Sequence, residues 1–238
     1  MILLIWVIEM KRFLTDKLIE WKNSKYRKPL ILRGARQVGK TYILKDFANT
    51  YYDNMAYFNF DHDSSLADLF VNTKDPKRII EQLSFVVGRK IEPANTLIIF
   101  DEVQECPDAL NSLKYFAEET PEYHIVAAGS LLGIKLSHTS FPVGKVDYLT
   151  LYPMTFSEFL IADGKENLVE YIKSIKEIQE IPKIFDEQLV EQLKKYYIIG
   201  GMPEVVNSWV NDKDIERVNY LQKNILQAYE DDFSKHLN

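Results

Sequence analysis

The sequence predicts an α/β fold in three layers, with helices on both faces of a mostly parallel five-stranded sheet. Three observations indicate this fold. Short runs that are apolar throughout alternate with stretches of helical periodicity, which is typical of parallel strands buried on both faces. Polar residues or glycine follow several of these runs, where the ligand-binding loops of such a sheet lie. Beyond residue 153 only helical patterns occur, so we expect an α-helical region after the sheet.

The individual elements follow from the same patterns. The first apolar run stops at Gly34, and the third is apolar until Asp101. In the helical stretches the apolar residues recur every three or four positions, and Pro121 ends the fourth of them. The expected strands cover residues 29–32, 55–60, 96–100, 124–128 and 146–151. The expected helices cover residues 13–22, 41–51, 79–90, 109–119, 185–198 and 214–236.

Two local signals mark helix ends in the second half of the chain. Thr155 and Glu158 have the spacing of a capping box, in which two side chains satisfy the free N–H groups at a helix start. Gly200 and Gly201 follow the helix expected over residues 185–198 and are expected to end it.

Composition excludes some classes of protein. Tyrosine, phenylalanine and isoleucine are spread along all 238 residues, which argues against disorder. The net charge of -6 argues against a protein that coats nucleic acid through bulk charge, although a local basic groove stays open. The single cysteine, Cys106, excludes an internal disulfide and fits a reducing cytoplasm.

The N-terminal run MILLIWVIEM is much shorter than the roughly 18–20 apolar residues that cross a bilayer. It also lacks the flanking residues of a signal peptide, so we expect a cytoplasmic protein without a membrane segment. The run is either an extra strand or upstream sequence read from a start codon at Met1 ahead of Met10, and we favour the second interpretation. We therefore expect an extension over residues 1–9, a core domain over 10–152, and a helical region over 153–238. The last helix ends without a stop signal, which suggests a fragment of a longer protein.

Residues 34–41 read GARQVGKT and match the Walker A pattern G-x-x-x-x-G-K-[ST] in full. Glycines let several backbone N–H groups converge on a phosphate, and the following helix adds the positive end of its dipole. Lys40 is expected to bridge the β- and γ-phosphates, and the Thr41 hydroxyl to bind Mg²⁺. The alternative, a turn that caps an ordinary helix, requires neither the strand before the pattern nor the helix after it. The expected nucleotide-binding residues are Gly34, Ala35, Arg36, Gln37, Val38, Gly39, Lys40 and Thr41.

An acidic pair follows the apolar run at residues 97–100, as in a Walker B pattern. Asp101 is expected to bind Mg²⁺ directly or through water, because this ion prefers hard oxygen ligands. Glu102 is expected to orient or deprotonate the attacking water. A switch that only binds nucleotide would not need Glu102, so this residue favours hydrolysis.

Other polar residues near the strand ends have two interpretations each. Ser130 either hydrogen-bonds the γ-phosphate or the attacking water, or begins a turn and caps the next helix. Asp61 and Asp63 could face the same crevice, but capping the following helix is the commoner role. Gln104 could touch substrate, although a solvated loop position is the ordinary one. The four histidines are scattered and form no metal-binding set with the cysteine.

Several segments together resemble a known family. The order GARQVGKT, LIIFDEVQ, IVAAGSLLG, VGKVDYLTLYPMTFSEFL and GGMPEVV resembles the prokaryotic AAA-type ATPases that carry an uncharacterised C-terminal domain. The resemblance runs from about Met10 to the end of the chain and includes the tail EDDFSKH. It is more specific than the phosphate loop alone.

The resemblance implies a P-loop NTPase core of the ASCE type, with one strand inserted between the phosphate-loop strand and the acidic strand. Residues 55–60 would form that strand. It also implies that Ser130 is a sensor residue in catalysis, that the helices after Pro153 form a lid, and that a further, often nuclease-like, C-terminal domain is missing. Many relatives have Gly-Arg where this sequence has Gly144 and Lys145, so an arginine-finger role is in doubt there. Other candidates for that role are Arg36, Arg78, Arg89 and Arg217.

Three functional hypotheses follow. The first is an Mg-dependent ATP hydrolase that couples hydrolysis of ATP to conformational change. The second is a nucleotide-gated binding module with little hydrolysis of its own. The third is a nucleic-acid-processing protein fuelled by ATP, since residues 22–28 form a small basic cluster, which a solvated turn also explains. The macromolecular partner, either protein or DNA, and the oligomeric state stay open.

Overall fold

The structure is a computed structural model that describes residues 10–130 and 144–236 of the chain. These residues form two compact units. The sheet unit comprises Leu14–Ala35 and Gly39–Leu151, and the helical unit comprises the described residues up to Phe13, Arg36–Val38 and the chain from Tyr152 onward. Each unit has its own buried apolar core. The N-terminal extension expected over residues 1–9 and the helix expected to start at Leu131 lie outside the described residues.

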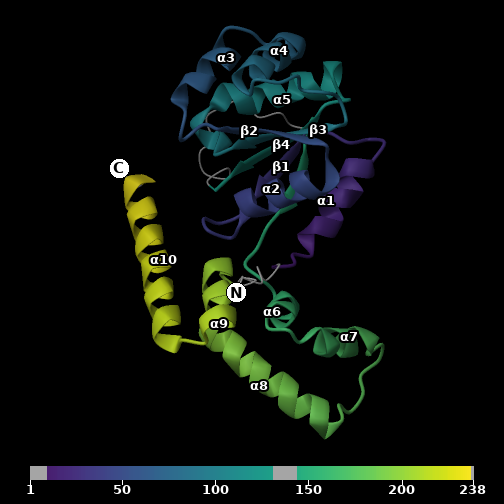
Figure 1. The fold of residues 1–238 in the computed structure, drawn as a ribbon, viewed down its shortest axis with the longest axis vertical. Coiled ribbons are helices and arrows are strands. Elements are labelled where there is room, and N and C mark those ends of the chain that lie inside the picture. Colours follow the sequence, from purple (N-terminus) through teal and green to yellow (C-terminus); the bar gives the residue numbers. More distant parts are fainter. Residues whose placement is uncertain (1–9, 131–143, 237–238) are drawn as a thin grey trace, which may run out of the picture. The chain divides into compact units, whose positions relative to one another are not determined.

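The strands of the sheet unit pair in parallel throughout its described part (Figure 1). Their spatial order is β2-β3-β4-β1-β5, so β4 lies between β1 and β3. β3 and β4 are buried along their whole length, as expected for runs without an exposed face. The predicted parallel five-stranded sheet is therefore confirmed. The strands are β1 (Leu30–Arg33), β2 (Asn54–Asn59), β3 (Thr96–Asp101), β4 (His124–Gly129) and β5 (Asp147–Thr150).

Helices cover both faces of this sheet, which confirms the three-layer prediction (Figure 1). α1 and α2 lie on one face, with Leu18 and Phe47 fully buried. α3, α4 and α5 lie on the other face, preceded by the short 3-10 turns η1 and η2. The bounds are α1 (Leu14–Asn23), α2 (Lys40–Tyr51), η1 (Ser64–Ala67), α3 (Asp68–Val71), α4 (Pro76–Val86), η2 (Val103–Glu105) and α5 (Pro107–Glu119).

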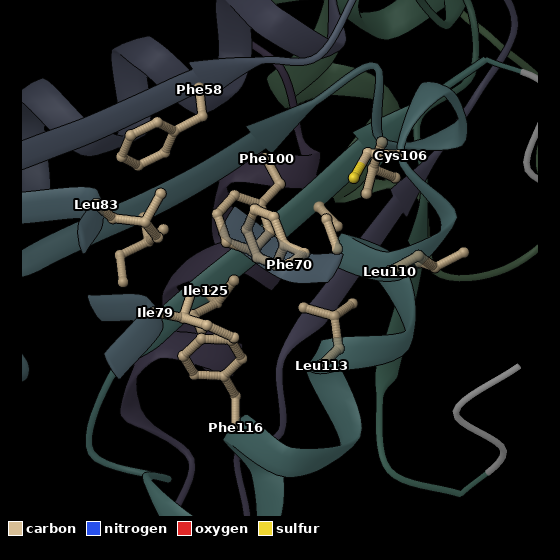
Figure 2. Close-up of a cluster of buried hydrophobic side chains, with 14 of the residues drawn as sticks. Phe58, Phe70, Ile79, Leu83, Phe100, Cys106, Leu110, Leu113, Phe116 and Ile125 are labelled. Carbon is tan, nitrogen blue, oxygen red and sulfur yellow. The ribbon is translucent and has the colours of Figure 1, made fainter. Parts of the chain in front are cut away.

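An aromatic cluster fills the space between the sheet and α3, α4 and α5 (Figure 2). The ring centroid of Phe100 lies 5.5 Å from that of Phe70 and 6.1 Å from that of Phe58, in edge-to-face contacts. Cys106 is buried in the same cluster, and this burial raises the pKa of its thiol. The cluster fixes the end of β3, from which the acidic residues of the candidate site follow.

The first helix of the helical unit after Tyr152, α6, starts with the capping box predicted for residues 155–158. The Thr155 hydroxyl accepts a hydrogen bond from the Glu158 backbone N–H at 3.2 Å, and the Glu158 carboxylate accepts one from the Thr155 N–H at 2.8 Å. The same carboxylate forms a buried ion pair with Arg12. The predicted glycine stop is also present, because Gly200, with φ at 74°, follows α8 directly. The helices are α6 (Phe156–Ala162), α7 (Glu166–Ser174), α8 (Lys183–Ile199), α9 (Pro203–Asp212) and α10 (Ile215–His236).

One expectation about the sheet is wrong. The strand at residues 55–60 does not lie between the phosphate-loop strand and the acidic strand, because β2 is at the edge of the sheet and β4 occupies the central position. The side chains explain the difference. β4 consists of fully buried residues, several of them small, which fit between two covered faces, whereas Asn54, Met55 and Tyr57 of β2 stay half-buried.

Some helix boundaries also differ from the predictions. The helix predicted over residues 79–90 begins at Pro76, because Asp75 caps it and proline is favoured at a first helical position. It ends at Val86, just before Gly88, whose φ is 69°. The short helices α3, α7 and α9 were not predicted, since they offer few turns of apolar periodicity. None of the helices that the structure describes is long and apolar enough to cross a membrane.

Candidate nucleotide-binding site

The predicted phosphate-binding residues 34–41 form the loop between β1 and α2 and the first two residues of α2. Gly39 has φ at 91°, a left-handed conformation that favours glycine, and it is the residue before the first turn of α2. No side chain of the described residues caps this turn, so its backbone N–H groups are directed out of the helix start without a side-chain acceptor. A helix start of this kind is suited to an anion such as a phosphate.

Lys40 is packed against this loop. Its side chain is 6% exposed, and its Nζ donates hydrogen bonds to the carbonyl oxygens of Gly34 at 2.9 Å and Ala35 at 2.8 Å. The ammonium group is therefore positioned over the loop by backbone acceptors of the loop itself. A phosphate group would offer stronger, charged acceptors to the same Nζ.

The two predicted magnesium ligands are in direct contact. The Thr41 hydroxyl donates a 2.7 Å hydrogen bond to Oδ2 of Asp101, whose side chain is almost fully buried. The Tyr57 hydroxyl donates to the same oxygen at 2.8 Å, and Asn59 donates to the Tyr57 oxygen at 3.2 Å. Burial raises the pKa of Tyr57 to about 12, so its phenol remains a hydrogen-bond donor at neutral pH. These oxygens have the hardness that Mg²⁺ requires.

Glu102 is held by its neighbours at the end of β3. Gln104 donates a 2.6 Å hydrogen bond to Oε2 of Glu102, and the Glu102 backbone N–H donates to Oδ1 of Asp101 at 3.1 Å. The backbone of Glu102 is left-handed, with φ at 50° and ψ at 42°, which is uncommon for a residue other than glycine or asparagine. The two predicted acidic residues therefore follow each other at a sharp bend in the chain.

The strand order explains why these distant residues meet. β1 and β3 both pair with β4, and all three strands run in parallel, so their carboxyl ends share one edge of the sheet. Ser130 directly follows β4, between the phosphate loop and the acidic strand. Its Oγ is buried and has no hydrogen-bond partner among residues 10–130 and 144–236. The hydroxyl is thus available to a ligand at this edge.

The arginines that were candidates for an arginine finger, and Lys145, are either engaged in other contacts or exposed. Lys145 forms a 2.7 Å ion pair with Glu118, and Arg89 donates to the side-chain oxygen of Asn54. Arg78 and Arg217 are exposed. Within the helical unit, Arg36 forms a 2.8 Å ion pair with Asp232 of α10.

Three contacts in this site were not anticipated from the sequence. Tyr57 and Asn59 were missed, although two polar residues at a spacing of two in an apolar strand indicate one common face. The register pairs Asn59 with Asp101, which places that face beside the acidic strand. Gln104 was expected to be a solvated loop residue, but it is half-buried against Glu102.

Asp63 caps the turn η1, as predicted for an aspartate at this position.

A fully parallel sheet with a GxxxxGKT loop after β1 and an acidic residue after the buried strand β3 defines the P-loop NTPase class. The chain belongs to a family within this class. A family described as "AAA domain" matches residues 26–160, more than half of the chain. This membership supports ATP binding and hydrolysis at the level of the family. Residues 190–238 match a domain of unknown function.

Comparison with solved structures finds distant similarities. DnaA from Aquifex aeolicus, bound to AMPPCP, is 15% identical over 90% of this chain and 65% of its own, with a TM-score of 0.45. The Drosophila ORC bound to DNA is 16% identical over 82% and 53%, with a TM-score of 0.45. C. elegans PCH-2 is 14% identical over 78% and 56%, with a TM-score of 0.41. The chain thus covers less than two thirds of each of these proteins. A search of curated proteins gave no match.

Proposed function

We propose that this protein is an Mg²⁺-dependent ATP hydrolase with its site at residues 34–41 and the ends of β3 and β4. One observation carries the proposal, the 2.7 Å hydrogen bond between Thr41 and Asp101. The two residues are 60 positions apart in the chain. Asp101 ends β3 and Thr41 follows β1, and these two strands are not neighbours in the sheet. An accidental glycine-rich turn would not bring a hydroxyl and a buried carboxylate to one point.

Different groups of the site bind the phosphates of the nucleotide and the magnesium ion. The backbone N–H groups of residues 34–41 and the Nζ of Lys40 bind phosphate oxygens, as their donor chemistry allows. Thr41 and Asp101 hold Mg²⁺ through their oxygens. When bound, this ion neutralises charge on the phosphates.

The remaining polar residues act on the water that attacks the terminal phosphate. Glu102 orients this water and accepts its proton, and Gln104 fixes the Glu102 carboxylate through the hydrogen bond at 2.6 Å. Ser130 donates to the terminal phosphate or to the water, because its buried Oγ has no partner in the described part of the chain. Loss of the terminal phosphate would remove an acceptor that is available to the Ser130 hydroxyl.

We propose further that turnover changes the conformation of the helical unit. Arg36 lies inside the phosphate-loop sequence, yet its contacts place it in the helical unit. There it pairs with Asp232, and its carbonyl accepts a 2.7 Å hydrogen bond from the hydroxyl of Tyr229. A movement of the loop on nucleotide binding would strain these two contacts with α10.

A second candidate is a nucleotide-gated binding module that hydrolyses slowly by itself. The observation that favours it is the ion pair of Lys145 with Glu118, at the position where an arginine was expected. A paired lysine offers neither the free charge nor the planar fork of an arginine finger. Turnover would then need a residue from a neighbouring molecule.

The test is Mg-dependent ATP binding and phosphate release, measured on one sample of the wild type and of Glu102→Gln. We expect the variant to bind ATP and to lose turnover, whereas the matched change Glu105→Gln, at an exposed position three residues further on, leaves turnover intact. Lys40→Ala is expected to lose most nucleotide binding. Wild-type turnover in Glu102→Gln would refute the assignment of the water-orienting residue. Binding without turnover in the wild type would favour the gated module.

A further inference from the structure

A cavity lies in the helical unit, lined by residues between 163 and 213, and plays no part in the proposed hydrolysis. It has a volume of about 360 Å³, is partly open to solvent, and is lined by the turn after α6, by α7, α8 and α9, and by the residue after α9. This volume is at the lower end of the range that is typical of small-molecule sites. We call it the α8–α9 cavity. Leu168 and the ring of Trp209 give it an apolar wall.

Two buried polar groups line this cavity without a hydrogen-bond partner. The side chain of Gln192 is 5% exposed, and its Oε1 has no partner in the described part of the chain. The indole Nε1 of Trp209 is also buried and has no partner within the same residues. Buried polar atoms of folded proteins are rarely left unpaired, because each has lost its hydrogen bonds to water. One unpaired acceptor and one unpaired donor therefore belong to side chains that line the same cavity.

The charged residues around the cavity have a positive surplus. Lys213 pairs with Asp163 and Lys195 pairs with Glu191, so each acid of the lining is already matched by a lysine. Lys165 is half-buried and forms no ion pair within the described residues. The lining thus holds three lysines and two acids, together with the unpaired indole N–H of Trp209. A lysine ammonium group and an indole N–H can both donate a hydrogen bond, and both suit an anionic oxygen.

We propose that the α8–α9 cavity binds a small hydroxylated organic anion. Its carboxylate or phosphate group accepts hydrogen bonds from the Trp209 indole N–H and from Lys165, and a hydroxyl of the same molecule donates to Oε1 of Gln192. The carbon skeleton packs on Leu168 and the Trp209 ring. A metabolite of the sugar-phosphate or hydroxy-acid class meets these requirements. The site is separate from residues 34–41 and does not depend on the proposed hydrolysis.

The chain offers a reporter inside the cavity. It contains three tryptophans, so three indole resonances are expected in a ¹H–¹⁵N spectrum, and Trp209→Phe identifies the one from the cavity. The probes are glycerol 3-phosphate and gluconate, with glycerol and inorganic phosphate as the neutral and the purely ionic comparison. The titrations use the Lys40→Ala variant, so that phosphate does not bind at the phosphate loop.

We expect glycerol 3-phosphate or gluconate to shift the Trp209 indole resonance saturably, and glycerol to leave it unchanged. Lys165→Gln should weaken the binding of the organic anion about tenfold or more. Lys194→Gln, at an exposed position of α8 that does not line the cavity, should not weaken it. Gln192→Leu should remove the preference for the organic anion over inorganic phosphate, because it removes the acceptor for the hydroxyl.

Two results would overturn the proposal. If inorganic phosphate shifts the resonance as strongly as both organic probes, the cavity attracts an adventitious ion only. If neither organic anion shifts it at about 10 mM, the cavity is not a site for this class of ligand. A circular dichroism melt of each variant checks that the fold is intact.

Discussion

Thr41 and Asp101 share a 2.7 Å hydrogen bond across the central strand β4, and the Tyr57 hydroxyl binds the same carboxylate oxygen. Tyr57 therefore positions the proposed magnesium ligand without being a ligand itself. We predict that Tyr57→Phe lowers the apparent affinity for Mg²⁺ in the ATPase assay about 10–100-fold, as is typical when the partner of a metal ligand is removed. A titration of activity against Mg²⁺ concentration measures this change.

The control for that prediction is Tyr148→Phe, a half-exposed tyrosine on β5. It should leave the magnesium dependence unchanged. An unaltered magnesium titration in Tyr57→Phe would mean that the hydrogen bond to Asp101 does not contribute to metal binding.

Gln104 holds Glu102 by a hydrogen bond of 2.6 Å. We predict that Gln104→Ala lowers kcat about tenfold with little change in KM, because it frees the carboxylate that we propose to orient the water and leaves residues 34–41 unchanged. Steady-state ATPase kinetics give both constants. A rise in KM without a fall in kcat would assign Gln104 to nucleotide binding.

Gly201 has no room for a side chain. A Cβ at this position would lie 3.0 Å from the backbone N of Met154 and still closer to the Met154 carbonyl oxygen. The two backbones are joined here, since the Met154 N–H donates a 2.6 Å hydrogen bond to the Gly201 carbonyl. We predict that Gly201→Ala lowers the free energy of unfolding by about 2–4 kcal/mol, as measured by urea denaturation.

Gly164→Ala is the matched control variant for Gly201→Ala. Gly164 has φ at 69° but open space around its Cα, so only backbone strain is added, at a cost of about 1 kcal/mol. Equal losses in the two variants would show that the close approach of Gly201 to Met154 does not limit stability.

His124 is buried at the start of β4, where its Nδ1 shares a 2.7 Å hydrogen bond with the Tyr52 hydroxyl. Burial, followed by the charges of Arg27 and Lys22, lowers the pKa of His124 from 6.5 to about 4. The imidazole of His124 therefore takes up a proton at a higher pH in the unfolded chain than in the folded chain. The folded state is therefore stabilised fully above pH 6.5, and this contribution is lost as the pH falls towards 4.

We predict that the free energy of unfolding falls by about 1–2 kcal/mol between pH 7 and pH 5 because of this residue. Urea denaturation at the two pH values measures the change, and His124→Asn should reduce it by that amount. His62→Asn, at an exposed position, should leave the pH dependence as it is. A dependence on pH that survives in His124→Asn would assign it to other groups.

The sequence was sufficient to predict the sheet and the position of the loop that joins its first strand to the next helix. Apolar runs such as residues 96–100 indicate parallel strands because both faces of such a strand are covered, and the GxxxxGKT pattern has strict requirements at each fixed position. The spatial order of the strands in the sheet was harder to predict from the sequence. The central position of β4 depends on how its small residues pack between two neighbours, which periodicity does not report.

The contacts of the site were predictable only in part. Asp101 and Thr41 belong to local patterns, so each could be assigned from a short stretch of sequence. The hydrogen bonds from Tyr57 and Gln104 depend on which strand pairs with β3 and on the bend after it. The α8–α9 cavity is lined by three separate stretches of chain, and nothing local in the sequence indicates it.

The left-handed backbone at Glu102 affects which residues a screen of variants would select at this position. An L-residue with φ at 50° costs roughly 1–2 kcal/mol relative to a relaxed conformation, and glycine would avoid that cost. In a library screened for heat resistance alone, glycine or asparagine should therefore be enriched at position 102, whereas a screen for turnover should retain glutamate. Heat resistance and turnover thus favour different residues at position 102, which is a trade-off between stability and activity.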